Sequence, residues 1–279
     1  SEEDAHKIME TMLDSGELDS CVTMHYNFPI GVSTVGRVST PALGKEMIIA
    51  TTTGTSAVNR TEAMIKNAIY GIVAAKSIGI ENPSVGILNV DNARTVERAL
   101  KELDKKGFPI TFGESGRADG GSVMRGNDLL MGSCDVMVTD TLTGNILMKM
   151  FSSFNTGGSY EASGYGYGPG IGFDYNRTIL ILSRASGTPV VANAIQYAAD
   201  LAKGDVKTIG KHELDLVKAV GLDDVINDLV RESHVKVCEE EVVMPPKEVV
   251  TASISGIDIM DLEDASQVQI GRASCRERV

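Results

Sequence analysis

An acid, a glycine-asparagine pair and a lysine follow one short apolar run, at spacings that suit the binding of an anion. The run Val136–Val138 stops at Asp140, Gly144 and Asn145 come next, and an apolar helical pattern then carries Lys149. Backbone N–H groups at a helix N-terminus bind anions such as phosphate, and a lysine roughly one turn further on adds positive charge. This stretch therefore predicts a phosphate-binding site.

The hypothesis of a phosphate site gives each residue of that stretch a role, and two of them, Thr143 and Lys149, also have a simpler explanation. Gly144 would let the backbone approach a ligand, Asp140 would orient a hydrogen-bond donor, and Thr143 would cap the helix. Thr143 fits an ordinary helix cap equally well, and a solvated surface lysine is the commoner explanation for Lys149.

Cysteines and histidines offer few further candidates for chemistry. Four cysteines without paired spacing indicate reduced thiols, and the four histidines lack zinc-ligand spacing, so neither a metal site nor a cofactor is expected. Cys21 opens a predicted strand, where a core residue or a nucleophilic thiol would fit, whereas Cys134 and Cys238 are expected to be buried. His25, near the end of the same strand, is a catalytic candidate, although a structural role fits equally well.

Alternating apolar runs and amphipathic patterns must position these residues. Short runs rich in Val and Ile predict buried strands over 21–26, 47–51, 85–90, 109–112, 134–139 and 178–182. Helical patterns over 61–77, 94–106, 144–154, 191–202, 211–220 and 223–232 alternate with them. This order predicts an α/β domain with a mostly parallel sheet over residues 1–235.

Hydroxyl, amide and glycine residues cluster where the predicted strands end. They are His25 and Asn27 after the first strand, Thr53, Gly54 and Thr55 after the second, and Asn89 after the third. Ligands of open parallel sheets bind beyond the carboxyl ends of the strands, so these residues are expected to lie beside the predicted phosphate site. The cluster has few charges and suits one small anion.

The glycine-rich stretches and the C-terminal part differ from this pattern. Residues 113–132 and 157–172 are expected to be exposed loops that are poorly ordered without partners. An acidic linker and the start of a small C-terminal α+β unit are expected over 236–269. Residues 270–279 resemble the translated read-through of a sequencing adaptor, so the chain is expected to be a fragment.

The composition argues against several classes of protein. The chain has 279 residues, and its formal net charge is −12. An acidic chain without a Lys/Arg cluster argues against nucleic acid and against an anionic membrane surface. No apolar run approaches the roughly 18 residues of a membrane-spanning helix and no signal peptide is visible, so a cytoplasmic protein is expected. The glycines fit neither a G-x-G-x-x-G dinucleotide motif nor a P-loop.

Three stretches of the chain resemble the phosphate acyltransferase family of phospholipid synthesis. They are "ELDSCVTMHYNFPIGV" at 17–32, "ENPSVGILNVDN" at 81–92 and "GSCDVMVTDTLTGNILMK" at 132–149. The family has an Asp-x-x-x-Gly-Asn-x-x-x-Lys stretch, which here falls on Asp140, Gly144, Asn145 and Lys149. The resemblance implies a three-layer α/β/α sandwich, as in phosphotransacetylases and isocitrate-type dehydrogenases.

Other stretches resemble a group of relatives of that family, the alpha subunits of component C of glycine/sarcosine/betaine reductase complexes. They are "MHYNFP" at 24–29, "RASGTPVVANAIQYAADLA" at 184–202 and "PPKEVVTASISGIDIMDLEDA" at 245–265. This resemblance implies transfer of an acetyl group from a thioester to inorganic phosphate, which gives acetyl phosphate. The implied partners are the beta subunit of component C and the small selenoprotein of the complex.

Two other functions compete with this one. An enzyme that takes acyl groups from acyl carrier protein would make long-chain acyl phosphate, although the polar turns "MHYNFP" and "TTTGTS" favour a short acyl group. A non-catalytic assembly subunit would use the glycine-rich stretches for docking.

The nucleophile of a covalent route is expected to lie late in the chain. Acyl transfer through an enzyme thioester needs an exposed, activated thiolate, and none of Cys21, Cys134 and Cys238 lies in a strand-end turn. The resemblance places a cysteine in the C-terminal unit that begins at Lys247, so the chain as given is expected not to complete the transfer. Cys21 is the alternative nucleophile.

Overall fold

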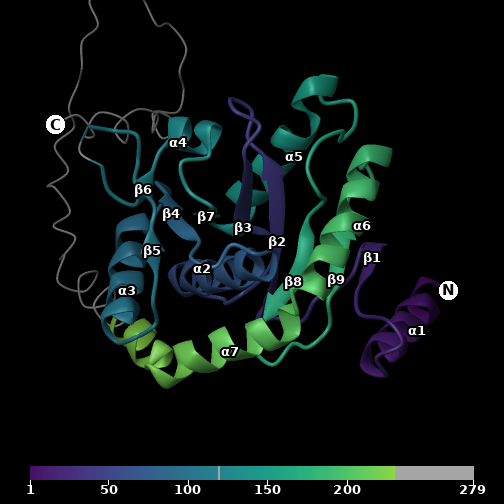
Figure 1. The fold of residues 1–279 in the computed structure, drawn as a ribbon, viewed down its shortest axis with the longest axis horizontal. Helices are drawn as coiled ribbons and strands as arrows, with labels where there is room; N and C mark the ends of the chain where they lie inside the picture. Colours follow the sequence, from purple (N-terminus) through teal and green to yellow (C-terminus); the bar gives the residue numbers. More distant parts are fainter. Residues whose placement is uncertain (119, 230–279) are drawn as a thin grey trace, which may run out of the picture. The chain divides into compact units, whose positions relative to one another are not determined.

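One mixed sheet forms the centre of the computed structural model, which describes residues 1–118 and 120–229. The order across the sheet is β1-β9-β8-β2-β3-β7-β4-β5, and β6 also pairs with β4 (Figure 1). The strands are β1 (Cys21–Met24), β2 (Val32–Ser39), β3 (Glu46–Gly54), β4 (Ser84–Leu88), β5 (Thr111–Phe112), β6 (Val123–Met124), β7 (Val136–Val138), β8 (Gly168–Gly172) and β9 (Ile179–Leu182).

The direction of the strands changes within the sheet. Parallel pairing joins β1 to β9, β3 to β7, and β4 to β5, β6 and β7. Antiparallel pairing joins β2 to β3, β2 to β8, and β8 to β9. The sheet is therefore mostly parallel, as predicted, but three successive antiparallel pairings make β1 and β9 run opposite to β3, β4 and β7.

Helices cover both faces of the sheet. They are α1 (Glu2–Asp14), α2 (Arg60–Ser77), α3 (Ala93–Lys105), α4 (Gly126–Met131), α5 (Thr141–Ser153), the 3₁₀ helix η1 (Phe154–Thr156), α6 (Thr188–Lys203) and α7 (Val206–Ala219). Residues 222–229 are also helical. The last two predicted helices, over 211–220 and 223–232, correspond to α7 and this segment, and α7 begins five residues earlier than predicted.

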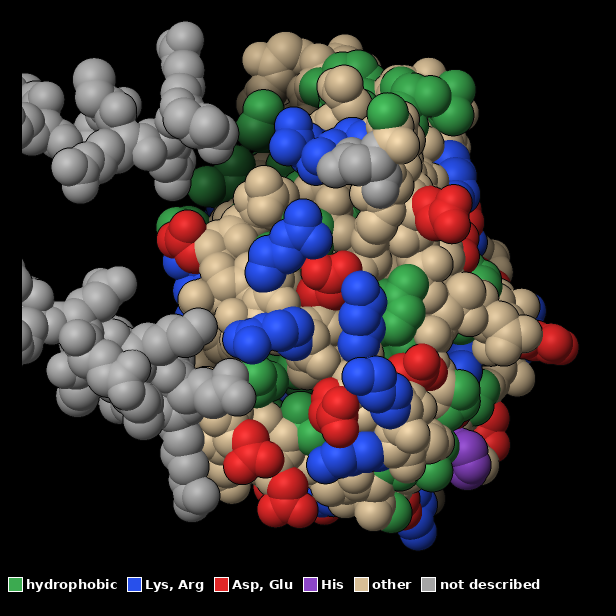
Figure 2. Space-filling view, turned by 90° about the vertical axis from the view of Figure 1, so that its left-hand side faces the viewer, with side chains coloured by type: hydrophobic (Ala, Val, Ile, Leu, Met, Phe, Trp, Pro, Cys, Tyr) green, Lys and Arg blue, Asp and Glu red, His purple; other side chains and the backbone are tan. Residues whose placement is uncertain are grey.

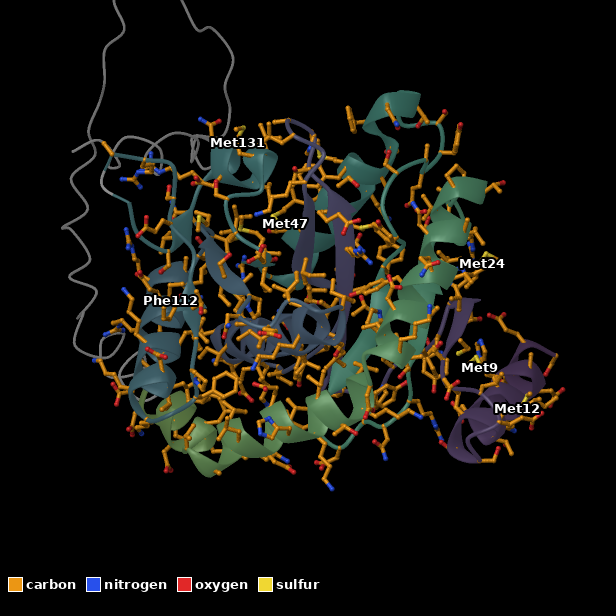
Figure 3. The ribbon with its side chains drawn as sticks, in the orientation of Figure 1. Met9, Met12, Met24, Met47, Phe112 and Met131 are labelled. Atoms are coloured by element: carbon orange, nitrogen blue, oxygen red, sulfur yellow. The ribbon has the colours of Figure 1, made fainter. Side chains whose placement is uncertain are left out.

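Alternating side chains of the central strands divide the core into two layers. Ile48 and Ala50 of β3 pack with α2, α3, α6 and α7, whereas Met47 and Ile49 pack with α4 and α5. Figure 3 shows Met47 in the middle of the sheet, where it is buried. Since successive residues of a strand point to opposite faces, this division confirms the prediction of a three-layer α/β/α sandwich.

Helix α1 lies at one edge of the sheet, beyond β1 (Figures 1 and 3). The Arg177 guanidinium holds it, with two hydrogen bonds of 2.8 Å to Asp14 and an ion pair of 3.3 Å to Glu10. Leu13 is the buried residue of the helix. Polar contacts therefore attach α1 more than apolar packing does.

Strand β8 corrects the prediction that residues 157–172 form an exposed loop. All five of its residues, Gly168–Gly172, are buried. A Cβ atom on Gly168 would lie 1.8 Å from the Val35 carbonyl oxygen, and one on Gly170 would lie 2.2 Å from the Phe28 ring. The glycines permit close packing of a strand, so their number did not indicate a loop.

The stretch 113–132 was also predicted to be a loop, and this prediction is wrong for much of its length. It contains β6 and α4, and the side chains of Val123, Met124 and Leu129 are buried. The backbone N–H of Asn89 bonds to the Met124 carbonyl at 2.8 Å, which ties the stretch to the end of β4.

Strand β2 was not predicted, because its sequence "VSTVGRVS" holds several polar residues. Ser33 and Thr34 are fully buried, yet both are hydrogen-bonded. Thr34 Oγ1 lies 2.7 Å from Thr52 Oγ1, and Ser33 Oγ donates to Asn67 Oδ1 at 3.3 Å. Buried hydroxyls are tolerated when they have partners of this kind, and neighbouring strands and α2 supply them here.

The surface at α3 carries charges of both signs. Figure 2 shows this side, which lies at the left of Figure 1, with Lys and Arg side chains interspersed with Asp and Glu. Arg94 and Lys101 each pair with Glu97 at 3.0 Å. None of the helices described is long and apolar enough to cross a membrane, and His, Cys, Asp and Glu form no metal-binding group in that part.

The predicted linker and C-terminal unit over 236–269, and the adaptor-like residues 270–279, lie outside the described residues. Cys238 and Cys275 lie there too.

Candidate functional site

A cavity of about 630 Å³ opens between the ends of β1 and β9, helix α5 and the segment that follows η1. It brings together five residues that were predicted for the site: His25, Asn27, Thr53, Asn145 and Lys149. The other lining residues are Tyr26, Ser153, Gly158, Tyr160, Glu161, Tyr167, Ile181, Leu182, Ser183, Arg184 and Ala185. Polar and apolar groups contribute about equally to this wall.

A larger cavity of about 820 Å³ lies between α7 and the segment that joins β8 to β9. It contains none of the predicted site residues. Its cations, Arg177, Lys207, Lys211 and Lys218, share the cavity with Asp174 and Asp215. Arg177 and Lys218 form ion pairs, whereas Lys207 and Lys211 form none with the residues described. The smaller cavity is the candidate site because it contains five of the predicted residues.

Two cations enter the smaller cavity without an acidic partner. Lys149 is exposed on α5 and Arg184 follows β9, and neither forms an ion pair with any of the residues described. Two cations in one cavity attract negative charge, so this cavity suits an anionic ligand.

The Arg184 side chain is oriented by His25. Arg184 Nε donates a hydrogen bond of 2.9 Å to His25 Nε2. In this contact His25 Nε2 is the acceptor. His25 has a left-handed φ of 51°, which few residues other than glycine adopt, and it turns the chain out of β1 toward the cavity. His25 thus holds the Arg184 guanidinium beside the cavity that both residues line.

Helix α5 presents Asn145 and Lys149 because it packs directly on β3. A Cβ atom on Gly144 would lie 1.7 Å from the Thr51 carbonyl oxygen, so only glycine allows this approach. Asn145 Nδ2 donates to the Thr52 carbonyl oxygen at 2.9 Å and secures the contact. The space beside Gly144 is filled by the protein backbone, which assigns this residue a packing role.

The N-terminus of α5 is capped by Asp140, so the prediction of Thr143 as the cap is wrong. Asp140 Oδ1 accepts from the Thr143 N–H at 3.1 Å, and Oδ2 accepts from Thr143 Oγ1 at 2.6 Å. Arg60 Nη2 lies 3.1 Å from Asp140 Oδ2. The Gly144 N–H bonds to the Asp140 carbonyl oxygen at 2.9 Å. The N–H donors predicted to bind phosphate therefore already have partners, and Asp140 and Thr143 do not line the cavity.

Burial and hydrogen bonding act in opposite directions on Asp140. Burial favours the neutral acid, but the hydrogen bonds from Thr143 and the charge of Arg60 outweigh it and hold the pKa of Asp140 below its ordinary value. The carboxylate is thus ionised when it caps the helix.

Three other predicted residues lie away from the cavity. Gly54 has a left-handed φ of 93°, and a Cβ atom there would lie 2.7 Å from the Val32 carbonyl oxygen, so it serves the β2–β3 contact. Thr55 continues that pairing through a bond of 3.3 Å from its N–H to the same oxygen. Asn89 is exposed at the end of β4, which β7 separates from β3.

The described thiols are poor nucleophiles. Burial raises the pKa of Cys21 to about 11 and that of Cys134 to about 12. Neither cysteine lines the cavity. Since the thiolate is the reactive form, both are expected to be inert at neutral pH.

Sequence reasoning missed Glu161, Tyr167 and Arg184. Arg184 comes two residues after a correctly predicted strand, so the rule that ligands bind at strand ends could have found it. Glu161 and Tyr167 lie in the stretch predicted to be a loop, where no pattern marked them. Burial, with a further contribution from the Glu161 charge, raises the pKa of Tyr167 to about 12, so its hydroxyl remains a donor at neutral pH.

Comparisons with known proteins agree with the resemblance. A family model described as "Fatty acid synthesis protein" matches residues 1–277. The alpha subunit of component C of the glycine/sarcosine/betaine reductase complex from Peptoclostridium acidaminophilum is 69% identical over 268 residues, which cover 96% of this chain and 70% of that subunit. A phosphate acyltransferase from Fervidobacterium nodosum is 35% identical over 137 residues, or 49% of this chain and 40% of that protein.

Among solved structures, a branched-chain phosphotransacylase from Enterococcus faecalis shares 16% identity with a TM-score of 0.45, over 68% of this chain and 76% of that one. The family model spans nearly the whole sequence, and the identity to the component C subunit extends over almost all of it. The chain therefore belongs to the fatty acid synthesis protein family. Its identity to a component C alpha subunit is high, and its identity to phosphate acyltransferases is lower.

Proposed function

We propose that this chain transfers an acetyl group from a thioester to inorganic phosphate within a glycine/sarcosine/betaine reductase complex, and that the product is acetyl phosphate. The observation that carries the proposal is that the cations Lys149 and Arg184 lie in one cavity with the predicted residues His25, Asn27, Thr53 and Asn145. The similarity to a component C alpha subunit and to phosphate acyltransferases supports the choice of reaction. The partners are then the beta subunit of component C and the small selenoprotein.

The reaction makes two demands on the cavity. An oxygen of phosphate attacks the carbonyl carbon of the thioester, the C–S bond breaks, and the sulfur leaves as a thiolate. The site must hold the phosphate in line with that carbon and stabilise the negative charge that develops on the carbonyl oxygen. Lys149 and Arg184 provide charge for the phosphate. The hydroxyl of Tyr167, which stays protonated, and the amide of Asn27 are donors available to the carbonyl oxygen.

The described cysteines take no part in this step, because the raised pKa values of Cys21 and Cys134 leave almost no thiolate at neutral pH. Phosphate would then attack a thioester that a partner delivers to the cavity. A route through an enzyme thioester would require a cysteine outside the described residues, as the resemblance implies for the unit that begins at Lys247.

The lining of the cavity favours a short acyl group over a long one. Ile181 and Leu182 are the branched aliphatic residues of its lining, and the rest of the apolar surface comes largely from three tyrosine rings that stand among amide, hydroxyl and charged groups. A fatty acyl chain needs an extended apolar slot, because it loses about 0.8 kcal/mol for each methylene that stays exposed to water. The alternative product, long-chain acyl phosphate, is therefore less well supported.

The test uses the assembled component C with its thioester donor. Lys149→Met and Arg184→Met should each raise the phosphate KM by about tenfold or more, because a unit charge near the anion is worth at least about 1.4 kcal/mol at a partly exposed site. Lys105→Met, which removes an exposed lysine from α3 with a relative exposure of 74%, is the matched control and should leave the KM unchanged.

Two results would count against the proposal. An unchanged phosphate KM in both cavity variants would show that Lys149 and Arg184 do not bind phosphate. Absence of acyl phosphate formation by the active complex, with acetyl and with long-chain donors, would favour the assembly subunit instead. A preference for the long-chain donor would favour the acyl-carrier-protein reaction.

A further inference from the structure

A buried carboxylate lies in the same cavity as the two unpaired cations. Glu161 has a relative exposure of only 3%, and it lines the cavity beside Lys149 and Arg184. An acid is unexpected in a site for an anion, because two negative charges close together in a poorly solvated place repel each other. The Glu161 carboxylate is therefore expected to face a group of the ligand that donates a hydrogen bond.

The backbone holds Glu161 firmly next to Arg184. The Glu161 N–H bonds to the Ala185 carbonyl oxygen, and the Gly187 N–H bonds to the Glu161 carbonyl oxygen, both at 2.8 Å. A Cβ atom on Gly187 would lie 2.7 Å from the Tyr160 ring and 2.9 Å from that carbonyl oxygen, so glycine is required for this bridge. The carboxylate thus has a defined place in the wall.

Only one of the two carboxylate oxygens has a partner. Ser186 Oγ donates to Glu161 Oε2 at 2.7 Å. Oε1 receives no hydrogen bond, and the carboxylate forms no ion pair, within residues 1–118 and 120–229. Oε1 is not one of the fully buried atoms that lack a partner in the described part of the chain, so it reaches the space of the cavity, where a donor on a ligand can bond to it.

We propose that Glu161 Oε1 accepts a hydrogen bond from the P–OH group of hydrogenphosphate and so makes the cavity select phosphate over sulfate. This inference rests on the proposed function, which supplies phosphate as the ligand. Phosphate keeps at least one proton near neutral pH, whereas sulfate, of nearly the same shape, keeps none. An ionised carboxylate only accepts hydrogen bonds, so it attracts the P–OH group and repels every oxygen of sulfate.

The same contact orients the nucleophile. When Glu161 holds the protonated oxygen of phosphate, the unprotonated oxygens face Lys149, Arg184 and the acyl carbon. An unprotonated oxygen is the one that must attack. No proton moves and no covalent bond to Glu161 forms in this step, so Glu161 is a positioning and specificity residue.

Calorimetric titration of the complete component C with three anions tests the inference. The wild type should bind phosphate and arsenate, which also keeps a proton, at least about tenfold more tightly than sulfate, the size of effect expected of one hydrogen bond to a charged group. Glu161→Gln has nearly the same shape and can still accept from Ser186. It should weaken phosphate binding, strengthen sulfate binding, and bring the two affinities to within a few-fold of each other.

Two further variants make the result decisive. Glu81→Gln removes the same charge from an exposed position outside the cavity and should leave all three affinities unchanged. Glu161→Asp keeps the charge but withdraws it by one methylene group. It should lose phosphate affinity while still rejecting sulfate, and it serves as the measurement if the Gln variant does not fold.

The outcomes separate this inference from the proposed function. If the wild type binds phosphate but binds sulfate equally well, or if Glu161→Gln leaves the ratio of the two affinities unchanged, the inference is wrong and the phosphate site stands. If the wild type binds no phosphate at all, both are wrong.

Discussion

Replacement of Asp140 should lower the free energy of unfolding without changing the KM for phosphate. The residue belongs to the Asp-x-x-x-Gly-Asn-x-x-x-Lys stretch that suggested a phosphate site, yet it lies outside the cavity and caps α5. Its side chain has a relative exposure of 10% and contacts Thr143 and Arg60. The structure therefore predicts that Asp140 positions α5, and through it Asn145 and Lys149.

The expected magnitude follows from the contacts that are lost. Asp140→Ala removes the cap, worth about 1 kcal/mol, and the hydrogen bond from Thr143 Oγ1, worth roughly another 1 kcal/mol. The pair with Arg60, whose side chain has a relative exposure of 47%, is screened by solvent and adds only about 0.5 kcal/mol. The total is about 2.5 kcal/mol, or about 5 to 10 °C in Tm for a domain of this size. Asp140→Asn keeps a cap and should lose about 1 kcal/mol.

The pH dependence gives an independent check. The folded-state pKa of Asp140 is lower than its ordinary value, because hydrogen bonds from Thr143 and the charge of Arg60 outweigh burial. The contribution of the ionised carboxylate is therefore complete above the ordinary pKa and is lost as the pH falls through the folded-state pKa. The difference in unfolding free energy between wild type and Asp140→Asn should accordingly shrink in acid.

Thermal and urea unfolding would be measured alongside the phosphate KM of the assembled component C. The reasoning predicts lower Tm values and, for Asp140→Asn, a phosphate KM within about twofold of the wild type, since no charge in the cavity changes. A large rise in the KM at unchanged Tm would refute it, because Asp140 would then contact the ligand.

Three further predictions concern packing, thiol chemistry and the N-terminal helix. Gly144→Ala should destabilise the fold by roughly 3 kcal/mol or more, since the new methyl group would overlap the Thr51 carbonyl oxygen. The control Gly126→Ala, which has open space around it, should change the midpoint of urea unfolding little. Cys21 and Cys134 should react slowly with iodoacetamide at pH 7 and faster as the pH approaches their raised pKa values of about 11 and 12; rapid labelling of either peptide at pH 7, measured by mass spectrometry, would contradict this. Arg177→Ala should speed hydrogen exchange in α1 and leave that of α2 unchanged, because the Arg177 guanidinium binds Asp14 and Glu10 of α1. Equal exchange in wild type and variant would show that other contacts hold α1.

Much of the fold could be predicted because the signal is local. The apolar runs of β3, β4, β7 and β9 and the periodic patterns of α2, α3, α5 and α6 were placed within a few residues of their positions. Strands β2 and β8 were missed for a non-local reason. The hydroxyls of Ser33 and Thr34 find partners on other elements, and Gly168 and Gly170 accommodate a carbonyl oxygen and a ring from distant parts of the chain.

Five of the residues predicted for the site line one cavity, although the argument that grouped them was incomplete. The argument from strand ends assumed one parallel sheet, whereas β1 and β9 run opposite to β3. His25 follows β1 and Thr53 lies near the end of β3, which runs in the opposite direction, yet both line one cavity to which α5 contributes Asn145 and Lys149. Residue types at strand ends identified candidates, but they did not determine which of them meet.

The sequence by itself determined an acidic α/β protein with a mostly parallel sheet and a helix that carries Asn145 and Lys149 after a buried strand. Apolar periodicity suffices for that, since it acts between residues that are close along the chain, whereas the family followed from the resemblance of several longer stretches. Only the tertiary structure decided which groups the cavity contains. Glu161, Tyr167 and Arg184 join it from a segment that resembles a loop and from the end of β9, through backbone bridges and glycine contacts between residues far apart in sequence. The order and direction of the strands decide which distant residues come together, and no local sequence pattern specifies that order.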